Sequence, residues 1–282
     1  MKNILISIIT PSYNQAKFIR RTLDSVLLHQ NHVNIEHIVV DGYSSDGTLE
    51  ILKEYKNRYP DKFSYIYEKD SGQSNAINKG FKRATGDIIG WINSDDYYEK
   101  HIFIDVVKEF NDPSVAWIIG NVISTYEGIN KMEKIVSRKI TYQNLLKNPD
   151  IVAQQGVFFR RGILEAVGGW DDSFYMVMDY DLWIRLSKVA DPKMINKYWG
   201  YFTHHSNSKT LGKTKRIQME EIMHILKREN VKYLQRQMAL SKKRFYYYKQ
   251  KLKHLLIKLR IIDKKYYSYP CSSKRWEIWK NK

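Results

Sequence analysis

The chain has 282 residues, 43% of them hydrophobic, a formal net charge of +17 at pH 7 and a single cysteine, Cys271. This length accommodates one large domain with an appendage, and one cysteine excludes both an intrachain disulfide and a cysteine metal cluster, as expected in a reducing compartment. No apolar run approaches the length of a membrane span, and no secretory signal precedes the first polar motif. We therefore expect a cytoplasmic protein.

Three apolar segments in the first part of the chain are predicted to be strands, and each ends in polar residues that lead into a helical pattern. The strands are expected over residues 4–9, 35–40 and 63–67, and the polar segments are 10–14, 41–48 and 68–75. Strands that alternate with helices of this length predict a largely parallel sheet with right-handed crossovers. All the polar segments should then meet at one edge of the sheet and form a nucleotide-sized crevice.

A fourth apolar run, Ile88 to Ile92, leads directly into Asn93-Ser94-Asp95-Asp96. This order delivers two adjacent carboxylates to the same edge of the sheet, where open α/β sheets bind ligands. Mg²⁺ and Mn²⁺ bind one or two carboxylates together with phosphate oxygens, so the pair predicts a metal that holds a diphosphate. Taken alone, the tetrapeptide also fits an acidic turn that caps the next helix.

Three motifs occur in order: Ile-Ile-Thr-Pro-Ser-Tyr-Asn from residue 8, Val-Val-Asp-Gly-Tyr-Ser-Ser-Asp-Gly-Thr from residue 39, and Trp-Ile-Asn-Ser-Asp-Asp from residue 91. Together they resemble the family 2 glycosyltransferases with the GT-A fold, which are inverting enzymes that use nucleotide-sugars. The resemblance extends from about Ile6 to about Thr210. It implies an α/β fold with a mostly parallel central sheet flanked by helices, Mn²⁺ or Mg²⁺ as cofactor, and a nucleoside diphosphate sugar, expected to be a UDP-sugar, as donor.

The resemblance also implies roles for individual residues. Pro11 and Tyr13 would line the base and ribose pocket, and Asp41 would accept a hydrogen bond from the nucleobase. Asp95 would bind the metal, whereas Asn93 stands where the usual Asp-x-Asp signature begins and offers a neutral oxygen that weakens metal binding. The predicted nucleotide-binding residues are Thr10, Pro11, Tyr13, Asp41, Asp70, Asn78 and Ser94, and the predicted metal ligands are Asp95, Asp96 and His205.

A later stretch, Met178-Asp179-Tyr180-Asp181, also resembles the family and places Asp179 at the position of its general base. An acceptor hydroxyl that attacks an anomeric carbon must lose its proton as the bond forms, and a positioned carboxylate can take that proton. Met178 departs from the family, which usually has Glu there. Asp181 is the competing candidate, and helix capping is the structural alternative for it.

Two further segments resemble the acceptor side and the metal side of the family's site. Gln155 and Trp183 are predicted on the acceptor side, while Phe158 and Phe159 are expected in the core rather than against a sugar. His205 fits a family element whose histidine approaches the diphosphate or the metal. A surface-loop histidine is the alternative interpretation.

The positive charge is concentrated at the C-terminus, where residues 213–282 hold 21 Lys and Arg against 5 Asp and Glu. A helical stripe of leucine and isoleucine runs from Leu252 to Ile262, flanked by basic residues and by clusters of aromatic residues. Such a helix is typical of binding to an anionic membrane surface, although a hairpin packed on the domain or on a second subunit is also possible. We predict a catalytic domain over 1–211 and a helical basic extension over 212–282, with the protein peripheral on the inner membrane face.

The sequence favours an inverting glycosyltransferase that transfers a sugar to a glycan or a lipid-linked glycan in surface polysaccharide synthesis. A nucleic-acid-binding protein that uses the basic tail is one alternative, which is disfavoured because no recognised nucleic-acid module accompanies the tail. A catalytically degenerate protein that only binds nucleotide-sugars is another. The presence of Asp41, Asp95 and Asp179 argues against it.

Overall fold

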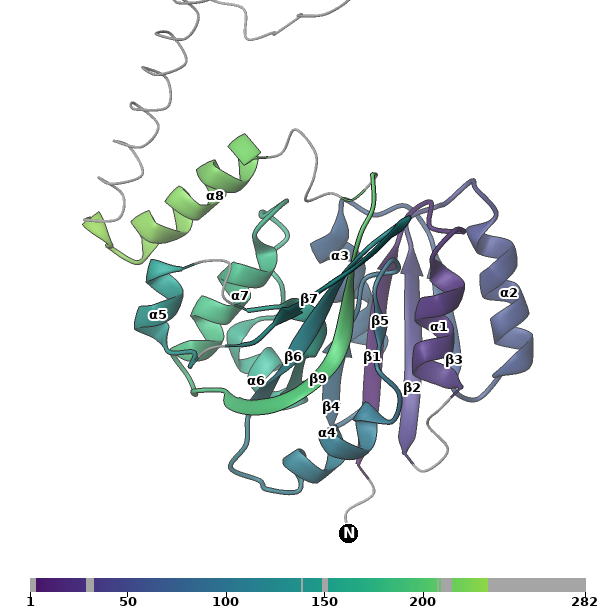
Figure 1. The fold of residues 1–282 in the computed structure, drawn as a ribbon, viewed down its shortest axis with the longest axis horizontal. Helices are drawn as coiled ribbons and strands as arrows, with labels where there is room; N and C mark the ends of the chain where they lie inside the picture. The colour runs from purple at the N-terminus through teal and green to yellow at the C-terminus, as the bar shows by residue number, and fades with distance from the viewer. Residues whose placement is uncertain are drawn as a thin grey trace, which may run out of the picture. The chain divides into compact units, whose positions relative to one another are not determined.

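Figure 1 shows the chain as a computed structural model, which describes residues 4–28, 33–137, 139–148, 152–206, 208 and 215–232. The chain divides into two compact units, Met1–Glu229 and Asn230–Lys282. The division falls later than the predicted boundary at 211/212, because the helix Lys215–Arg228 belongs to the first unit and buries Ile222, Ile225 and Leu226. The predicted stripe from Leu252 to Ile262 lies outside the described residues.

The first unit is built on a mixed sheet, and in the described residues nine strands follow the order β3-β2-β1-β4-β8-β6-β9-β5, with β7 paired to β6. The strands are β1 Leu5–Ser12, β2 Asn34–Asp41, β3 Phe63–Tyr67, β4 Ile88–Trp91, β5 Tyr97–Tyr98, β6 Trp117–Tyr126, β7 Ile129–Ile135, β8 Val157–Arg160 and β9 Lys193–His204. The helices are α1 Ile19–Leu27, α2 Thr48–Arg58, α3 Gln73–Arg83, α4 Ile102–Phe110, α5 Tyr142–Lys147, α6 Arg161–Val167, α7 Met178–Ser187 and α8 Lys215–Arg228, with a 3-10 turn at Gln154–Gly156.

Strands β1 to β4 are parallel, as the alternation of strands and helices predicts. Ser12 pairs with Asp41, and Asp41 pairs with Tyr67, so three strands end side by side. The predicted meeting of the polar segments at one edge is therefore confirmed. Beyond β4 the sheet is mixed, because β8 runs antiparallel to both β4 and β6.

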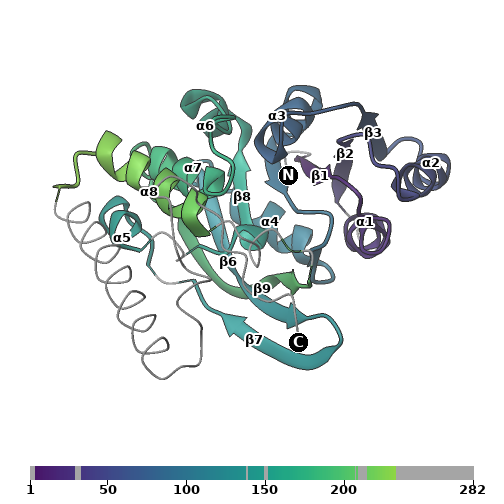
Figure 2. The same cartoon turned by 90° about the horizontal axis from the view of Figure 1, so that it is seen from above.

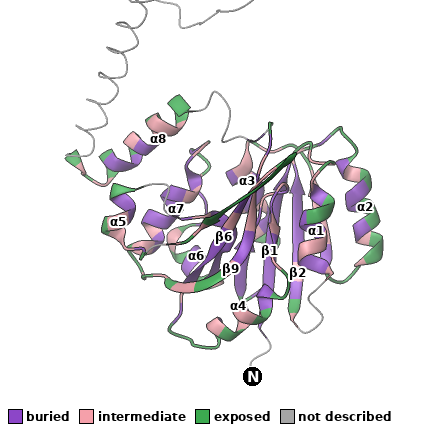
Figure 3. Ribbon diagram, in the orientation of Figure 1, coloured by how far each residue is buried: buried purple, intermediate pink, exposed green. Residues whose placement is uncertain are grey.

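Helices cover both faces of the parallel strands: α1 and α2 lie on one face and α3 on the other (Figure 2). The cover on both faces explains why β1, β2 and β4 are rich in apolar residues and buried along most of their length, whereas β3 at the edge of the sheet is partly buried (Figure 3). Ile6 and Ile8 share a buried cluster with Leu23 of α1. Ile9 faces α3, where a Cβ on Gly80 would lie 2.5 Å from its Cγ2, so the glycine permits the close approach of helix and strand.

Within the described residues, none of the helices is both long enough and apolar enough to span a bilayer.

Candidate active site

The ends of β1, β2 and β3 bring together three residues predicted to bind the nucleotide: Tyr13, Asp41 and Asp70. Asp41 is buried, and its carboxylate accepts hydrogen bonds from the backbone N–H and the hydroxyl of Ser44, both at 2.7 Å. A Cβ on Gly42 would lie 2.7 Å from Asp70 Oδ2 and 3.4 Å from Tyr13 Cδ2, so both side chains flank this backbone. Tyr13 is 62% exposed and presents its ring at the edge. This edge thus presents the aromatic face of Tyr13 and the carboxylate of Asp70, beside the buried carboxylate of Asp41.

The side chains of Thr10 and Asn78 lie elsewhere than predicted. The Thr10 hydroxyl is buried and lies 2.9 Å from Nε2 of His37, a ring whose pKa burial lowers to about 3 and which is therefore neutral. The Asn78 amide donates to the carbonyl of Trp170 and to Asp172, both at 2.7 Å, and its oxygen accepts from the Trp170 N–H at 3.1 Å. These side chains therefore brace the fold.

Pro11 and Ser94 are buried. The carbonyls of Ser94 and Asp96 both accept from the hydroxyl of Thr22 in α1, at 2.9 and 2.6 Å. In this way α1 holds the loop after β4 in place.

Asp95 and His205 come together from distant parts of the chain. His205 Nε2 lies 2.9 Å from Asp95 Oδ2, although the two residues are 110 positions apart. The Asp95 side chain is 21% exposed and that of His205 is 2% exposed. The Phe18 ring supports the imidazole at a centroid distance of 4.4 Å. A carboxylate oxygen from the loop after β4, the strand that pairs with β1, thus meets an imidazole nitrogen from the residue that follows β9.

Asp96, predicted as a second metal ligand, points into the protein instead. It is fully buried, and its carboxyl accepts from Gln155 Nε2 at 2.7 Å, from the Thr203 N–H at 2.8 Å and from Asn93 Nδ2 at 3.3 Å. Burial, followed by the nearby charge of Asp95, raises the pKa of this carboxyl well above its usual range. The structure therefore corrects the prediction for Asp96, which anchors the loop that presents Asp95. Gln155, predicted on the acceptor side, is buried and takes part in the same anchor.

Asp179 lies in the first turn of α7 and is partly buried. Its Oδ1 accepts a hydrogen bond from the Tyr180 N–H at 2.8 Å. Ser74 at the start of α3 donates to the sulfur of Met178 at 2.8 Å, which ties this turn to the helix that follows Asp70. The predicted base thus lies in the first turn of α7, which contacts the start of α3, the helix that follows Asp70.

The backbone that leads into α7 is held by Glu221 of α8. One carboxylate oxygen accepts from the N–H of Tyr175 at 2.7 Å, and the other accepts from those of Met176 and Val177 at 2.8 and 3.0 Å. The Glu221 carboxylate thus accepts three charge-assisted hydrogen bonds from the backbone segment that precedes Asp179. No sequence motif indicates this role, because Glu221 lies beyond every motif and beyond the predicted domain boundary.

Asp181, the competing candidate for the base, has a structural role. Its side chain is fully buried and pairs with Arg185 at 2.7 Å and with Arg228 of α8 at 2.6 Å. Both oxygens are thus bound to guanidinium groups, and Asp181 has no capping role because the N-cap position is Val177. This arrangement leaves Asp179 as the better-placed carboxylate of the two.

Trp183, predicted on the acceptor side, packs in the core and is 1% exposed. Its ring stacks on Trp91, Trp117 and Phe159 at centroid distances of 5.8, 5.9 and 5.7 Å. The prediction for Trp183 is wrong because this face of α7 covers the sheet. The expectation that Phe158 and Phe159 are core residues is confirmed, since both are fully buried.

The family model described as glycosyl transferase family 2 matches residues 7–168 of this chain, which is more than half of its length. The chain is a family 2 glycosyltransferase.

Among curated relatives, the transferase is 27% identical to the hyaluronan synthase of Pasteurella multocida over 81% of this chain and 24% of the relative. It is 29% identical to the chondroitin synthase of Escherichia coli, over 68% of this chain and 28% of the relative. It is 34% identical to the putative teichuronic acid biosynthesis glycosyltransferase TuaG of Bacillus subtilis, over 51% of this chain and 58% of the relative. The chain thus spans between about a quarter and three fifths of these relatives.

Among solved structures, the transferase resembles residues 1–349 of S. aureus TarS in complex with UDP-GlcNAc, with a TM-score of 0.63 and 19% identity over 78% of this chain and 65% of that one. It also resembles the mannosyltransferase PcManGT of Pyrobaculum calidifontis in complex with GDP-Man and Mn²⁺. The TM-score is 0.57, with 19% identity over 77% of this chain and 61% of that one. These similarities confirm the predicted fold.

The Glu221 contacts predict that Glu221→Gln lowers the turnover of the transferase and leaves donor KM unchanged. The amide replaces one acceptor oxygen by a donor, which would face backbone N–H groups, so the start of α7 must shift. A displacement of about 1 Å at a reacting group can cost about a hundredfold in rate. Steady-state kinetics with Glu220→Gln as the matched control would test this, because Glu220 is exposed and pairs with Arg216. Equal turnover of the two variants would contradict the positioning role.

Proposed function

We propose that the chain is an inverting, metal-dependent glycosyltransferase that moves a sugar from a UDP-sugar to a hydroxyl of a glycan or a lipid-linked glycan. The observation that carries the proposal is the contact between Asp95 and His205 at the edge where Tyr13, Asp41 and Asp70 meet. A similar structure contains UDP-GlcNAc, and relatives are named for the synthesis of hyaluronan, chondroitin and teichuronic acid. These names support a polysaccharide as the acceptor class.

Asp95 and His205 would hold Mn²⁺ or Mg²⁺ through one oxygen and one nitrogen. The described residues contain no group of three or more His, Cys, Asp or Glu side chains that could hold a metal, so the donor's phosphate oxygens and water would have to complete the coordination. The donor set fits a cation of this kind, and the imidazole nitrogen favours Mn²⁺ because Mg²⁺ prefers oxygen ligands. When bound, the cation stabilises the charge that develops on the diphosphate leaving group.

Asp179 would act as the general base. The acceptor hydroxyl oxygen attacks the anomeric carbon from the face opposite the diphosphate, a new C–O bond forms, and the bond to the phosphate oxygen breaks. The hydroxyl proton passes to Asp179, and the electron pair of the broken bond leaves with UDP. One displacement inverts the anomeric configuration.

A panel of nucleotide-sugars, assayed with the full chain and Mn²⁺, tests this proposal. We expect UDP with Mn²⁺ to raise the melting temperature, and NMR of the product to show the anomeric configuration opposite to that of the donor. Stabilisation only by an oligonucleotide would favour the nucleic-acid alternative. Stabilisation by UDP without turnover of any sugar would favour the degenerate alternative.

We also propose that the basic C-terminal segment brings the enzyme to the cytoplasmic face of an anionic membrane. Support comes from the charge distribution, since residues 233–282 hold 15 Lys and Arg against 2 Asp and Glu. Each basic residue near an anionic leaflet contributes about 1 kcal/mol to binding. The apolar stripe from Leu252 to Ile262 would add hydrophobic burial.

Deletion of residues 233–282 is expected to abolish association with anionic vesicles while UDP binding remains. The cut lies after α8, because a cut after Leu211 would also remove Glu221 and Arg228, which hold the start of α7 and Asp181. Co-sedimentation with anionic and with zwitterionic vesicles measures the effect, and salt should weaken it because charges are screened within about 10 Å at 0.1 M. Equal vesicle binding by both forms would support the packed-hairpin or oligomer interpretation.

A further inference from the structure

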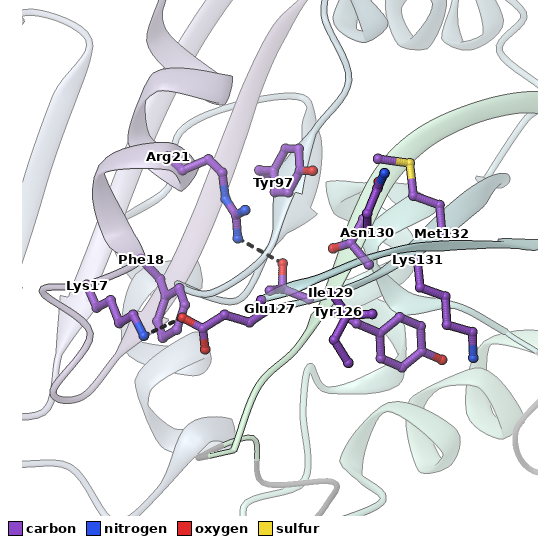
Figure 4. Close-up of a pocket in the computed structure, with 13 residues that line it drawn as sticks. Lys17, Phe18, Arg21, Tyr97, Tyr126, Glu127, Ile129, Asn130, Lys131 and Met132 are labelled. Atoms are coloured by element: carbon purple, nitrogen blue, oxygen red, sulfur yellow. Dashed lines mark hydrogen bonds and ion pairs between the residues drawn. The ribbon is translucent and has the colours of Figure 1, made fainter.

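A cavity of about 450 Å³ lies between the start of α1 and the β6–β7 hairpin (Figure 4). Its wall includes Lys17, Phe18 and Arg21 from one side, residues 125–132 from the hairpin, and Tyr97 and Thr203 from the sheet. Neither Asp179 nor any predicted nucleotide-binding residue lines it. Its volume lies within the range of small-molecule sites, which runs from about 300 to 1,000 Å³.

Arg21 supplies the cavity with a cation that is held by neutral groups. Its Nη2 donates to the carbonyl of Asp95 at 3.1 Å and to the hydroxyl of Thr203 at 2.9 Å. Its guanidinium lies 4.2 Å from the centroid of the Tyr97 ring. Both hydrogen-bond acceptors are uncharged, so these contacts fix the guanidinium without compensating its charge. A fixed guanidinium presents N–H donors in a fork that matches a carboxylate or a phosphate.

Two further cations and one carboxylate line the same cavity. Lys17 pairs with Glu127 at the turn of the hairpin, which ties α1 to the hairpin. The Lys131 ammonium lies 4.6 Å from the centroid of the Tyr126 ring. Lys131 also pairs with Glu133 at 2.7 Å, so both lysines are compensated and the positive charge that favours an anionic ligand is that of Arg21.

Polar and aromatic side chains also line the cavity. Phe18, Tyr97 and Tyr126 all contribute to its wall, together with the polar side chains of Thr125 and Asn130. The faces of the two tyrosine rings are occupied, because Tyr97 stacks on Tyr201 at 4.4 Å and Tyr126 stacks on His204 at 4.5 Å, with Arg21 and Lys131 over the same rings. The hydroxyl and amide groups are therefore the ones that can bond to the hydroxyls of a sugar. An inorganic anion would fill only a small part of the cavity, and a neutral sugar would leave Arg21 uncompensated.

We propose that this cavity binds an acidic saccharide unit, with its carboxylate or phosphate at Arg21 and its hydroxyls at Thr125 and Asn130. The identification of this unit as part of the acceptor glycan rests on the proposed function. The cavity adjoins the metal-binding pair, because Arg21 bonds the Asp95 carbonyl and Phe18 packs against His205. A glycan held here would therefore contact the residues that orient Asp95.

Calorimetry with the full chain, without UDP or metal, tests the proposal on three oligosaccharides of equal length: one with uronic acid units, one with phosphate esters and one neutral. We expect the acidic compounds to bind and the neutral one to bind at least tenfold more weakly. Arg21→Gln should weaken the acidic compounds by at least about tenfold, the loss expected for one hydrogen bond to a charged group. Comparison of the uronic acid compound with the phosphate ester compound shows which of the two anionic groups the cavity prefers.

Arg20→Gln is the matched control, since Arg20 is the neighbouring residue and pairs with Glu54 away from the cavity. It should leave the affinity unchanged, and Arg21→Lys should retain part of it if the variant melts like the parent. Equal affinity of Arg21→Gln and the parent, or displacement of the oligosaccharide by UDP alone, would overturn the proposal. If Arg21-dependent binding is found but no UDP-sugar is turned over, the proposed function fails while the acidic-saccharide site stands.

Discussion

Asp179→Asn is expected to leave UDP binding unchanged and to lower the rate of sugar transfer by about two to four orders of magnitude. The amide keeps the shape of the side chain and can still accept the N–H of Tyr180, the contact seen at 2.8 Å. It does not accept the proton of the acceptor hydroxyl, so only the chemical step should suffer. Calorimetry with UDP and Mn²⁺, combined with initial rates of transfer, separates the two effects.

Asp181→Asn provides the comparison for this result. Asp181 faces Arg185 and Arg228 in a buried site, so loss of its charge should lower the melting temperature. The folded fraction should still turn over, because neither oxygen of Asp181 is available to a substrate. If Asp181→Asn remained well folded and lost more activity than Asp179→Asn, Asp181 would be the base.

The edge of the parallel sheet could be predicted because its signals are local. Each strand is an apolar run of a few residues, and the polar residues follow it immediately in the sequence. Parallel pairing then places Ser12, Asp41 and Tyr67 side by side without further information. The fold and the clustering of Asp41 with Asp70 follow from that logic.

The direction in which each side chain points is a different matter, because it depends on partners that are distant in sequence. Asp95 and Asp96 are adjacent and chemically identical, yet one is partly exposed and the other is buried among donors from Gln155 and Thr203. Trp183 lies one helical turn after Asp179, which made it a plausible site residue. The tertiary packing of α7 on Trp117 and Phe159 decides its role instead.

The contribution of α8 was missed for a related reason. The rise in positive charge after residue 211 favours a basic appendage that begins there. However, Glu221 and Arg228 of α8 hold the start of α7 and Asp181 through polar contacts between residues distant in sequence, and such contacts have no periodic signature. The compact unit that contains the candidate site extends to Glu229.

Asp95→Ala is expected to abolish the effect of Mn²⁺ on UDP affinity. His205 would then be the only remaining protein donor of the pair, and its imidazole would lose the carboxylate that contacts it at 2.9 Å. Loss of an outer-shell partner alone costs about ten- to a hundredfold in metal affinity, so loss of a direct ligand should cost at least as much. Calorimetric titration of UDP with and without Mn²⁺ measures the effect directly.

The matched control for this change is Asp61→Ala, an exposed aspartate just before β3 and therefore at the opposite edge of the sheet. It should keep the full dependence on Mn²⁺. His205→Ala should reproduce the loss seen for Asp95→Ala, and the double variant should be little worse than either single one, because two ligands of one ion are not additive. An Asp95→Ala variant with unchanged affinity for UDP and Mn²⁺ would remove Asp95 from the metal site. Additive losses would instead place Asp95 and His205 in separate sites.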